Sequence, residues 1–179
     1  MNAVFLDTSK KLFRYYKGLA EKAIAQTPEK DLFILPRENE NSIAIIVQHL
    51  AGNMLSRWTD FLTTDGEKPW RNRDQEFEVQ FTDKEALMNY WEKGWKVFLD
   101  TLDNLTEDDL GKTIHIRQDP QLVIEAIQRQ LAHYPYHVGQ IVYLCKFFTN
   151  EAFESLSIPK GKSEAFNQQS GEKRPWQKK

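Results

Sequence analysis

The sequence predicts an all-α protein built as a four-helix bundle. Four long segments carry apolar residues at steps of three and four residues, which is the period of an amphipathic helix. The chain has 179 residues, enough for about one domain, and 40% of them are hydrophobic, so it can bury one core. Four helices with one apolar stripe each must hide these stripes against one another, and a bundle is the simplest arrangement that does so.

The first two helices are expected in the N-terminal third of the chain. The first runs over about residues 4–26 and stops before Thr27-Pro28. Its apolar stripe consists of Phe5, Leu12, Tyr16, Leu19 and Ala23. The second begins after Asn41 or Ser42, either of which can cap its first turn. Its apolar stripe consists of Ile43, Val47, Leu50, Met54, Trp58 and Phe61.

The third and fourth helices carry start signals of their own. Thr82-Asp83-Lys84-Glu85 is a capping-box signature, and the stripe after it consists of Leu87, Trp91, Gly94, Phe98 and Leu102. Asp119-Pro120 is expected to open the fourth helix, as a cap followed by proline at the first helical position. The fourth stripe consists of Val123, Ile127, Leu131, Tyr134, Val138, Ile141, Cys145 and Phe148. Pro135 lies inside this segment, so the helix is either kinked there or divided in two.

The segments between the helices are long in two places, residues 27–40 and 63–81. Because long loops in a compact domain are usually functional or disordered, the apolar content of the second one is informative. It contains Trp70, Phe77 and Phe81, and we expect it to pack over one end of the bundle and to border the functional site. Residues 113–116 alternate in polarity and predict a short strand before the last helix.

The expected domain covers residues 1–167, with an irregular C-terminal segment, and residues 168–179 form a basic tail expected to be flexible. The formal net charge is −2 and no long basic stripe occurs before the tail, which argues against nucleic-acid binding. The longest apolar run is residues 43–47, far too short to span a membrane. Together with the single cysteine, Cys145, these features favour a soluble cytoplasmic protein without disulfides.

Three histidines are the strongest candidates for chemistry. His133 and His137 are four residues apart, so on one helix both rings can reach one ion. His49 lies on the second expected helix beside small residues that leave room around its ring. Three histidines from two helices would form a three-nitrogen metal site with an open coordination position. The alternatives are a chance pair on a surface helix and a helix break at Pro135 that separates the pair.

The remaining candidates carry weaker signals. His115 lies in the strand-like segment and is expected at the surface, not as a fourth ligand. Cys145 falls on an apolar stripe, which favours a buried free cysteine over a nucleophile. Arg71, Arg73 and Asp74 are either solvated loop charges or, if the loop closes over the metal, groups that hold an anionic substrate.

Four segments of the sequence resemble the DinB-like superfamily, and most of all its YfiT-related branch of metal-dependent enzymes without an assigned function. They are residues 42–53, residues 65–74, residues 129–140 and residues 157–167, so the resemblance covers nearly the whole chain. The most specific feature is one histidine in the first half followed by a late HxxxH pair, which binds a divalent metal in that family. Carried over, these positions are His49, His133 and His137.

The resemblance also implies a four-helix bundle and a homodimer. Members of the superfamily include thiol-dependent S-transferases and isomerases, and others are described as hydrolases, so the resemblance leaves the reaction open. The metal is expected to be a divalent transition metal, zinc or nickel, although imidazole ligands suit zinc, nickel, copper and iron about equally well. Asn53, Arg71, Arg73 and Gln140 are the candidate substrate-binding residues.

The spacing of the late histidines bears on the reaction. Metallohydrolases of the HExxH kind carry a glutamate beside the metal, and here that position is Tyr134. A low-molecular-weight thiol needs no such base, because zinc-like metals deprotonate a coordinating thiol. The sequence therefore favours metal-assisted transfer of a thiol to an electrophilic small molecule. Hydrolysis by metal-activated water and a non-enzymatic metal-binding or stress-response role are the alternatives.

Overall fold

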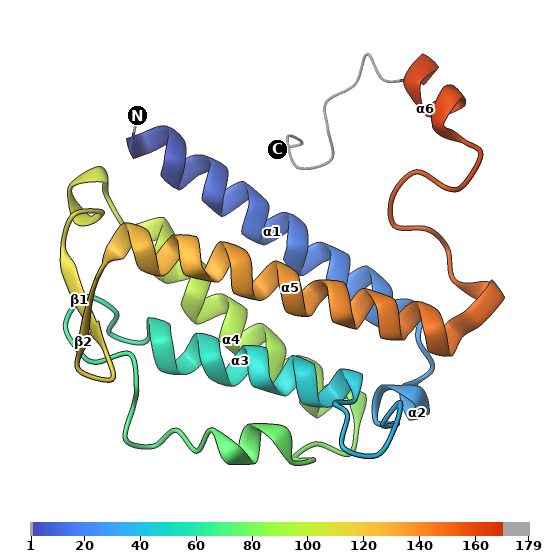
Figure 1. Cartoon of the computed structure of the whole chain (residues 1–179), viewed down its shortest axis with the longest axis horizontal. Helices are drawn as coiled ribbons and strands as arrows, with labels where there is room; N and C mark the ends of the chain where they lie inside the picture. Colours follow the sequence, from blue (N-terminus) through green and yellow to red (C-terminus); the bar gives the residue numbers. More distant parts are fainter. Residues whose placement is uncertain (1, 170–179) are drawn as a thin grey trace.

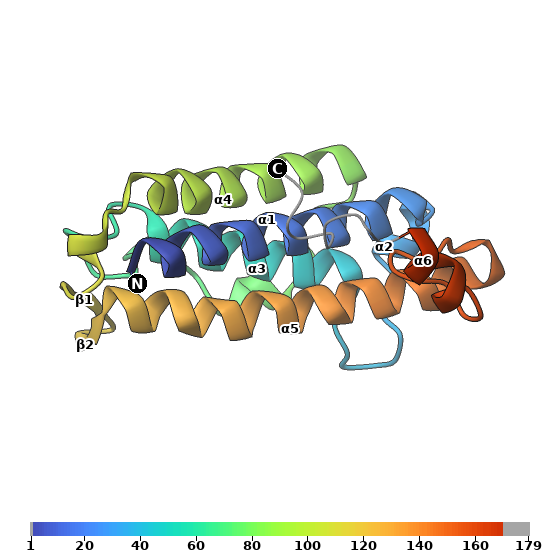
Figure 2. The ribbon, with the colours of Figure 1, turned by 90° about the horizontal axis from the view of Figure 1, so that it is seen from above.

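The computed structural model describes residues 2–169 and is mostly helical. Its four long helices, which lie side by side in Figures 1 and 2, are α1 (Asn2–Gln26), α3 (Ile43–Trp58), α4 (Lys84–Asn104) and α5 (Val123–Thr149). Helices α1 and α3 each contact both α4 and α5, so every long helix has two long neighbours. Among the described residues, no helix is both long enough and apolar enough to cross a membrane.

The shorter elements connect the long helices. They are α2 (Glu29–Leu32), the 3₁₀ helices η1 (Asp74–Phe77), η2 (Glu107–Asp109) and η3 (Asn150–Ala152), the strands β1 (Thr113–Ile116) and β2 (Asp119–Leu122), and α6 (Ser163–Gln169). The presence of α6 corrects the expectation that this part of the C-terminal segment is irregular. Residues 170–179 of the expected basic tail lie outside the described residues.

The structure confirms the short strand but not the expected start of the last helix. Strand β1 pairs antiparallel with β2, with Ile116 opposite Asp119. Asp119-Pro120 therefore belongs to a strand, and α5 begins only at Val123, where the Glu125 carboxylate accepts a hydrogen bond from the Leu122 N–H at 2.8 Å. The two residues between the strands both have positive φ angles, 57° and 65°, as a tight hairpin turn requires.

The other helix starts follow local capping. The Ser42 hydroxyl accepts a hydrogen bond from the Ile45 N–H at 3.2 Å, which confirms one of the two expected caps of α3. Helix α4 is capped by Asp83 instead of Thr82, since the Asp83 carboxylate accepts from the Ala86 N–H at 2.7 Å. Helix α5 continues through Pro135 without a break, so the two late histidines stay on one helix.

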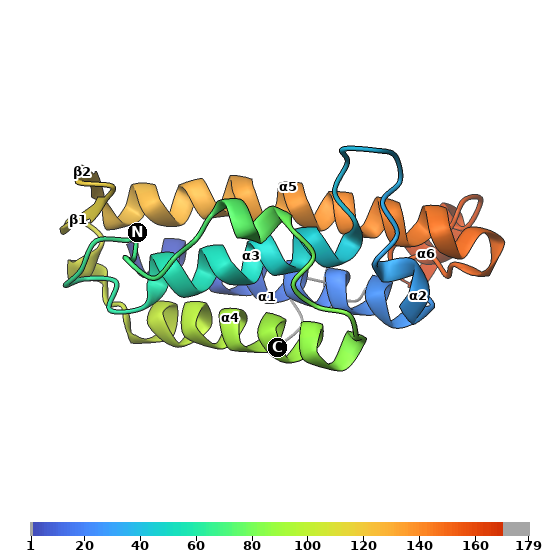
Figure 3. The same ribbon diagram turned by 90° about the horizontal axis from the view of Figure 1, so that it is seen from below.

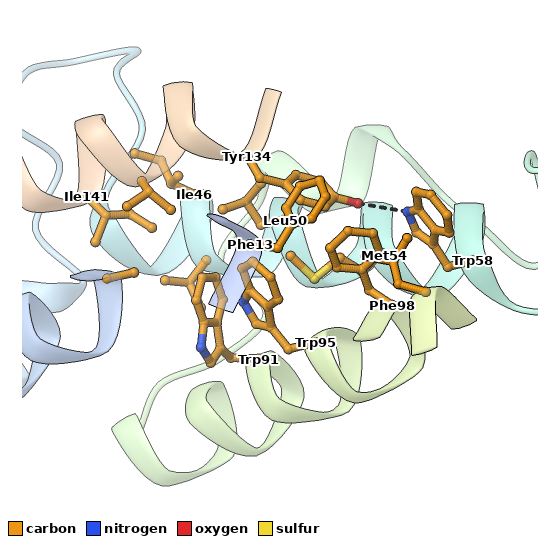
Figure 4. Packing of buried hydrophobic residues seen from close by; sticks show 14 of the residues in the cluster. Phe13, Ile46, Leu50, Met54, Trp58, Trp91, Trp95, Phe98, Tyr134 and Ile141 are labelled. Carbon is orange, nitrogen blue, oxygen red and sulfur yellow. Dashed lines mark hydrogen bonds between the residues drawn. The ribbon is translucent and has the colours of Figure 1, made fainter. Parts of the chain in front are cut away.

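The core contains aromatic side chains from all four long helices, which meet between the helices in Figure 4. The ring of Phe98 on α4 lies 4.6 Å from that of Phe13 on α1 and 5.1 Å from that of Tyr134 on α5, measured between centroids. Trp58 on α3 donates its indole N–H to the Tyr134 hydroxyl at 3.1 Å. These contacts turn the face of α5 that carries Tyr134 toward the core and so fix the rotation of this helix about its axis.

The segment of residues 63–81 runs back along α3, as the view in Figure 3 shows. The expectation that it packs over one end of the helices holds only for its first residues, where Gly66 contacts Ser56 near the end of α3 and His115 on β1. The rest of the segment covers the side of α3. Gln48, in the first half of α3, donates its side-chain amide to the carbonyl oxygens of Gln75, Glu76 and Glu78 at 2.9–3.0 Å. These hydrogen bonds hold η1 against the side of α3, close to His49.

Candidate metal centre

His49, His133 and His137 lie together between α3 and α5. One ring nitrogen from each can be chosen so that all three lie within 4.8 Å of one another. The Nε2 atoms of His49 and His133 are 3.4 Å apart. Two ligands at about 2.1 Å from one tetrahedral ion are separated by about the same distance. His49 is buried and the other two are half-buried, so the three rings could hold a metal ion.

The Nδ1 atom of each ring is engaged by an oxygen atom. His49 Nδ1 lies 3.0 Å from the Glu76 carboxylate, and His133 Nδ1 lies 3.1 Å from the side-chain oxygen of Gln130. His137 Nδ1 lies 2.7 Å from the side-chain oxygen of Gln140. Because these oxygens accept hydrogen bonds, each Nδ1 carries the proton and each Nε2 keeps its lone pair for a ligand.

Electrostatics keep the late histidines neutral. Burial, followed by the neighbouring His137 and His49, lowers the pKa of His133 to about 3. Burial also lowers the pKa of His137, although its hydrogen bond with Gln140 acts in the opposite direction. Neutral imidazole is the form that binds a metal, so these two rings are ready for a cation near neutral pH without first losing a proton.

Glu76 connects the loop to His49. Burial alone would raise its pKa, but the hydrogen bonds from His49 and Arg71 outweigh burial and lower it. Arg71 donates from Nε to one carboxylate oxygen at 2.7 Å and from Nη2 to the other at 2.9 Å. A Cβ at Gly52 would lie 2.7 Å from the Glu76 Oε1, so glycine there gives the carboxylate room beside α3.

A cavity of about 180 Å³ adjoins the histidines and is lined by His49 and His133 themselves. Of the expected substrate-binding residues, Asn53, Arg71 and Arg73 line this cavity. Asn53 also accepts a hydrogen bond from the Tyr134 hydroxyl at 3.1 Å. Gln140 is not among the lining residues; it holds His137, and its own amide nitrogen donates to the Tyr136 hydroxyl at 3.3 Å.

Tyr134, His115 and Cys145 do not belong to the histidine cluster. Tyr134 is fully buried in the core, where burial raises its pKa, and it cannot replace the glutamate of an HExxH site. His115 is exposed on β1 and does not belong to the cluster. Cys145 is free and buried, and burial raises the pKa of its thiol to about 11, as expected of a core cysteine and not of a nucleophile.

Sequence reasoning did not identify the residues that hold the histidine rings, and it assigned Gln140 to the substrate instead. Gln130 precedes His133 by three residues and Gln140 follows His137 by three, so helical spacing alone could have indicated both contacts. Glu76 is 27 residues from His49 in a segment without regular periodicity, and the sequence contains no signal for that contact. The ring of Phe77 stacks on His49 with centroids 5.0 Å apart, and it belongs to the same segment.

Comparison with known proteins gives a family but no activity. The model of the family described as "Protein of unknown function (DUF1572)" matches residues 1–162, which includes all the residues of the candidate metal centre. No curated protein matches the chain.

Proposed function

The chain belongs to the DUF1572 family, which is related to the DinB-like proteins, and from this premise we propose that it is a metal-dependent enzyme with the DinB-like four-helix bundle. We place it in the YfiT-related branch on the sequence resemblance described above. The proposed reaction is transfer of a low-molecular-weight thiol to an electrophilic small molecule. The observation that carries the proposal is the convergence of three imidazoles whose Nδ1 atoms are all engaged by oxygen atoms.

This donor set fits a divalent transition metal, with zinc or nickel as the proposed ion. Three neutral nitrogens leave at least one coordination position open, whereas structural zinc sites usually have four protein ligands. A metal bound there would supply Lewis acidity, which lowers the pKa of a thiol or of water placed at the open position. Around it, Glu76, Gln130 and Gln140 fix the tautomers and orientations of the rings.

The nearest carboxylate favours the thiol over water as the nucleophile. Hydrolysis needs a base for the proton of water, and Glu76 is the acidic residue that touches the histidine cluster. Both of its oxygens accept from Arg71, one also faces His49, and its pKa is lowered, so it is a weak base. Metal-dependent hydrolysis is therefore the second candidate, and a non-enzymatic metal-binding role is the third.

The proposal is tested by elemental analysis of the purified protein and then by activity assays. We expect about one divalent ion per chain in the wild type and loss of most of it in His137→Ala, because that substitution removes a ligand. His115→Ala is the matched control and should retain the metal, since His115 lies outside the cluster. The metal-loaded protein should consume a low-molecular-weight thiol in the presence of an electrophile such as an activated aryl halide.

Each other outcome points to a different function. Ester cleavage without thiol would replace transfer by hydrolysis as the activity. Tight metal retention with neither reaction would favour the binding role. Equal metal loss in His137→Ala and His115→Ala would mean that the three histidines are not the ligands.

A further inference from the structure

The cavity beside the histidines gathers most of the arginines of the chain. The sequence contains eight arginines and 16 lysines. Five arginines line this one cavity: Arg57, Arg71, Arg73, Arg117 and Arg129. None of the lysines within residues 2–169 does. No aspartate or glutamate lines it. Arginine differs from lysine in presenting a planar fork of donors that matches the two oxygens of a carboxylate or phosphate.

These arginines come from separate parts of the fold. Arg57 lies in the last turn of α3, Arg71 and Arg73 lie in the segment that covers α3, and Arg117 is in the turn of the β-hairpin. Arg129 lies on α5, one turn before His133. Like charges from four separate segments repel one another, so bringing them to one cavity costs free energy unless an anion is present.

The acidic residues nearby do not satisfy this charge. A single oxygen of Glu67 lies at ion-pair distance from three arginines, 3.5 Å from Arg57, 3.6 Å from Arg71 and 3.3 Å from Arg117. Glu76 is shared between Arg71 and His49. Asp65 accepts the backbone N–H groups of the hairpin turn, and no ion pair among the described residues involves Arg73 or Arg129.

Two guanidinium nitrogens are buried without a hydrogen bond. They are Nη1 of Arg57 and Nη1 of Arg71, whose side chains are only 8% and 3% exposed. Their distances to Glu67 give electrostatic attraction but no hydrogen bond. Burial and the neighbouring Arg71 lower the pKa of Arg57 to about 10, because Glu67 does not offset them. A buried donor without an acceptor is costly, and an oxyanion in the cavity would supply the missing acceptors.

We propose that this arginine-lined cavity binds a carboxylate or phosphate group of the substrate and holds the substrate next to the metal ligands. This inference deepens the proposed function. It rests on that proposal only in treating the bound molecule as a substrate. The cavity is smaller than the ~300–1,000 Å³ of pockets for drug-sized ligands, so the bound part is a small group of few atoms. His49 and His133 form part of the same wall, so a molecule anchored by the arginines extends toward the histidine cluster.

The test is calorimetric titration of the full chain, as purified and after removal of metal by a chelator. The probes are succinate, inorganic phosphate and, as the uncharged counterpart, succinamide. We expect an oxyanion to bind in both preparations, with an affinity that falls as salt rises, and succinamide not to bind. Succinate binding without phosphate binding would identify a carboxylate as the recognised group, and the reverse would identify a phosphate.

Two substitutions and one control link the binding to the cavity. Arg57→Gln and Arg129→Gln should each weaken anion binding by roughly tenfold or more, since each removes charged hydrogen-bond donors. Arg129 is exposed and forms no ion pair within the described part of the chain, so Arg129→Gln should fold even if Arg57→Gln does not. Arg37→Gln removes the same charge from an exposed residue outside the cavity and should leave the affinity unchanged.

The inference is overturned if neither anion binds at millimolar concentration or if Arg37→Gln weakens binding as much as Arg129→Gln. Metal content measured on the same preparations separates the two proposals. If the protein binds anions through these arginines but retains no metal, the cavity is an anion site and the proposed metal-dependent reaction is refuted. If the protein retains metal but binds neither anion, the metal-dependent function stands and the anion site is refuted.

Discussion

At the scale of single residues, the candidate centre depends on how each histidine is held. The ring of His49 is fixed on one edge by Glu76 and on one face by Phe77, both from the segment that covers α3. His133 and His137 are fixed instead by glutamines on their own helix. Glu76 is 27 residues from His49 in the sequence, whereas the two glutamines are three residues from their histidines. The interaction between Glu76 and His49 is therefore the most informative one to remove.

Glu76→Gln should lower metal affinity by about 10–100-fold, the usual effect of losing a partner of a metal-binding histidine. A glutamine can turn its oxygen toward His49, but its amide nitrogen then faces the donors of Arg71, so it cannot satisfy both partners. Stability should fall as well, because Arg71 is buried. Competition with a chromophoric chelator, on protein shown to be folded by circular dichroism, measures the affinity.

Glu78→Gln is the matched control for this substitution. Glu78 is exposed two residues further along, and its backbone carbonyl, not its side chain, is the group that contacts Gln48. Metal affinity should be unchanged in this variant. Unchanged affinity in Glu76→Gln would show that the carboxylate does not support the metal site.

The sequence was sufficient to find the three histidines and, with Asn53, Arg71 and Arg73, part of the cavity beside them, but not most of the contacts that hold the rings. Helical spacing joins His133 to His137, and the small neighbours of His49 together with the family resemblance add the third histidine from another helix. Gln130 and Gln140 lie three residues from the histidines that they hold, so helical spacing also accounts for these two contacts. Glu76, Arg57 and Arg117 come to the site only through the path of the loop and the hairpin, and no local pattern in the sequence encodes that path.

At the scale of secondary structure elements, Gly94 allows α4 to approach α3 closely. A Cβ at this position on α4 would lie 2.8 Å from the Cα of Ala51 on α3. Ala51 directly precedes Gly52 and lies two residues after His49 on α3, so the contact between α3 and α4 also fixes the helix that carries the first ligand. Periodicity placed Gly94 on the apolar stripe, but only the fold explains why it is glycine.

Gly94→Ala should lower the free energy of unfolding by about 1–3 kcal/mol, because backbone atoms of α3 would have to move. Gly18→Ala is the control, since nothing lies within 4 Å of a Cβ there and the residue is inside α1. That variant should be neutral or more stable by up to ~1 kcal/mol, the gain of alanine over glycine in a helix. Urea denaturation measures both, and equal effects would contradict the close approach.

The element boundaries show where local rules succeed and where they are overridden. Ser42 caps α3 as expected, because a cap depends on neighbouring residues alone. Asp119-Pro120 has the local features of a helix start, yet pairing with β1 draws it into a strand. The turn before it consists of Arg117 and Gln118, and its N–H groups are held by the Asp65 carboxylate, a contact from another part of the chain.

At the scale of the whole molecule, one amphipathic pattern accounts for most of the fold. The expected stripes of α3, α4 and α5 supply most of the buried apolar residues of these three helices. In α1 the expected stripe is wrong except for Ala23, because the buried apolar residues there also include Leu6, Phe13, Ala20 and Ile24. Three tryptophans, Trp58, Trp91 and Trp95, are also buried in this core. Trp70 is exposed and Trp176 lies outside the described residues, so the tryptophan count, one reason to expect a homodimer, does not support that expectation.

The exposed face of α5 offers a better argument, and we propose that the chain forms a homodimer through it. Tyr136, Tyr143 and Phe147 are 63%, 68% and 63% exposed, and their spacing of seven and four residues places them on one side of the helix. Large aromatic side chains are enriched where protein surfaces meet. The face is also linked to the metal centre, because Tyr136 accepts a hydrogen bond from Gln140, which holds His137.

Light scattering at micromolar concentration should therefore give a mass of twice 21.1 kDa for the wild type. Tyr143→Glu should shift the mass toward that of one chain, since burying a carboxylate against a second aromatic face is unfavourable. Val4→Glu is the control, because Val4 is 64% exposed on α1 and not on this face, and it should leave the dimer intact. A wild-type mass of 21.1 kDa would refute the dimer, whereas a dimer that persists in Tyr143→Glu would place the interface elsewhere on the molecule.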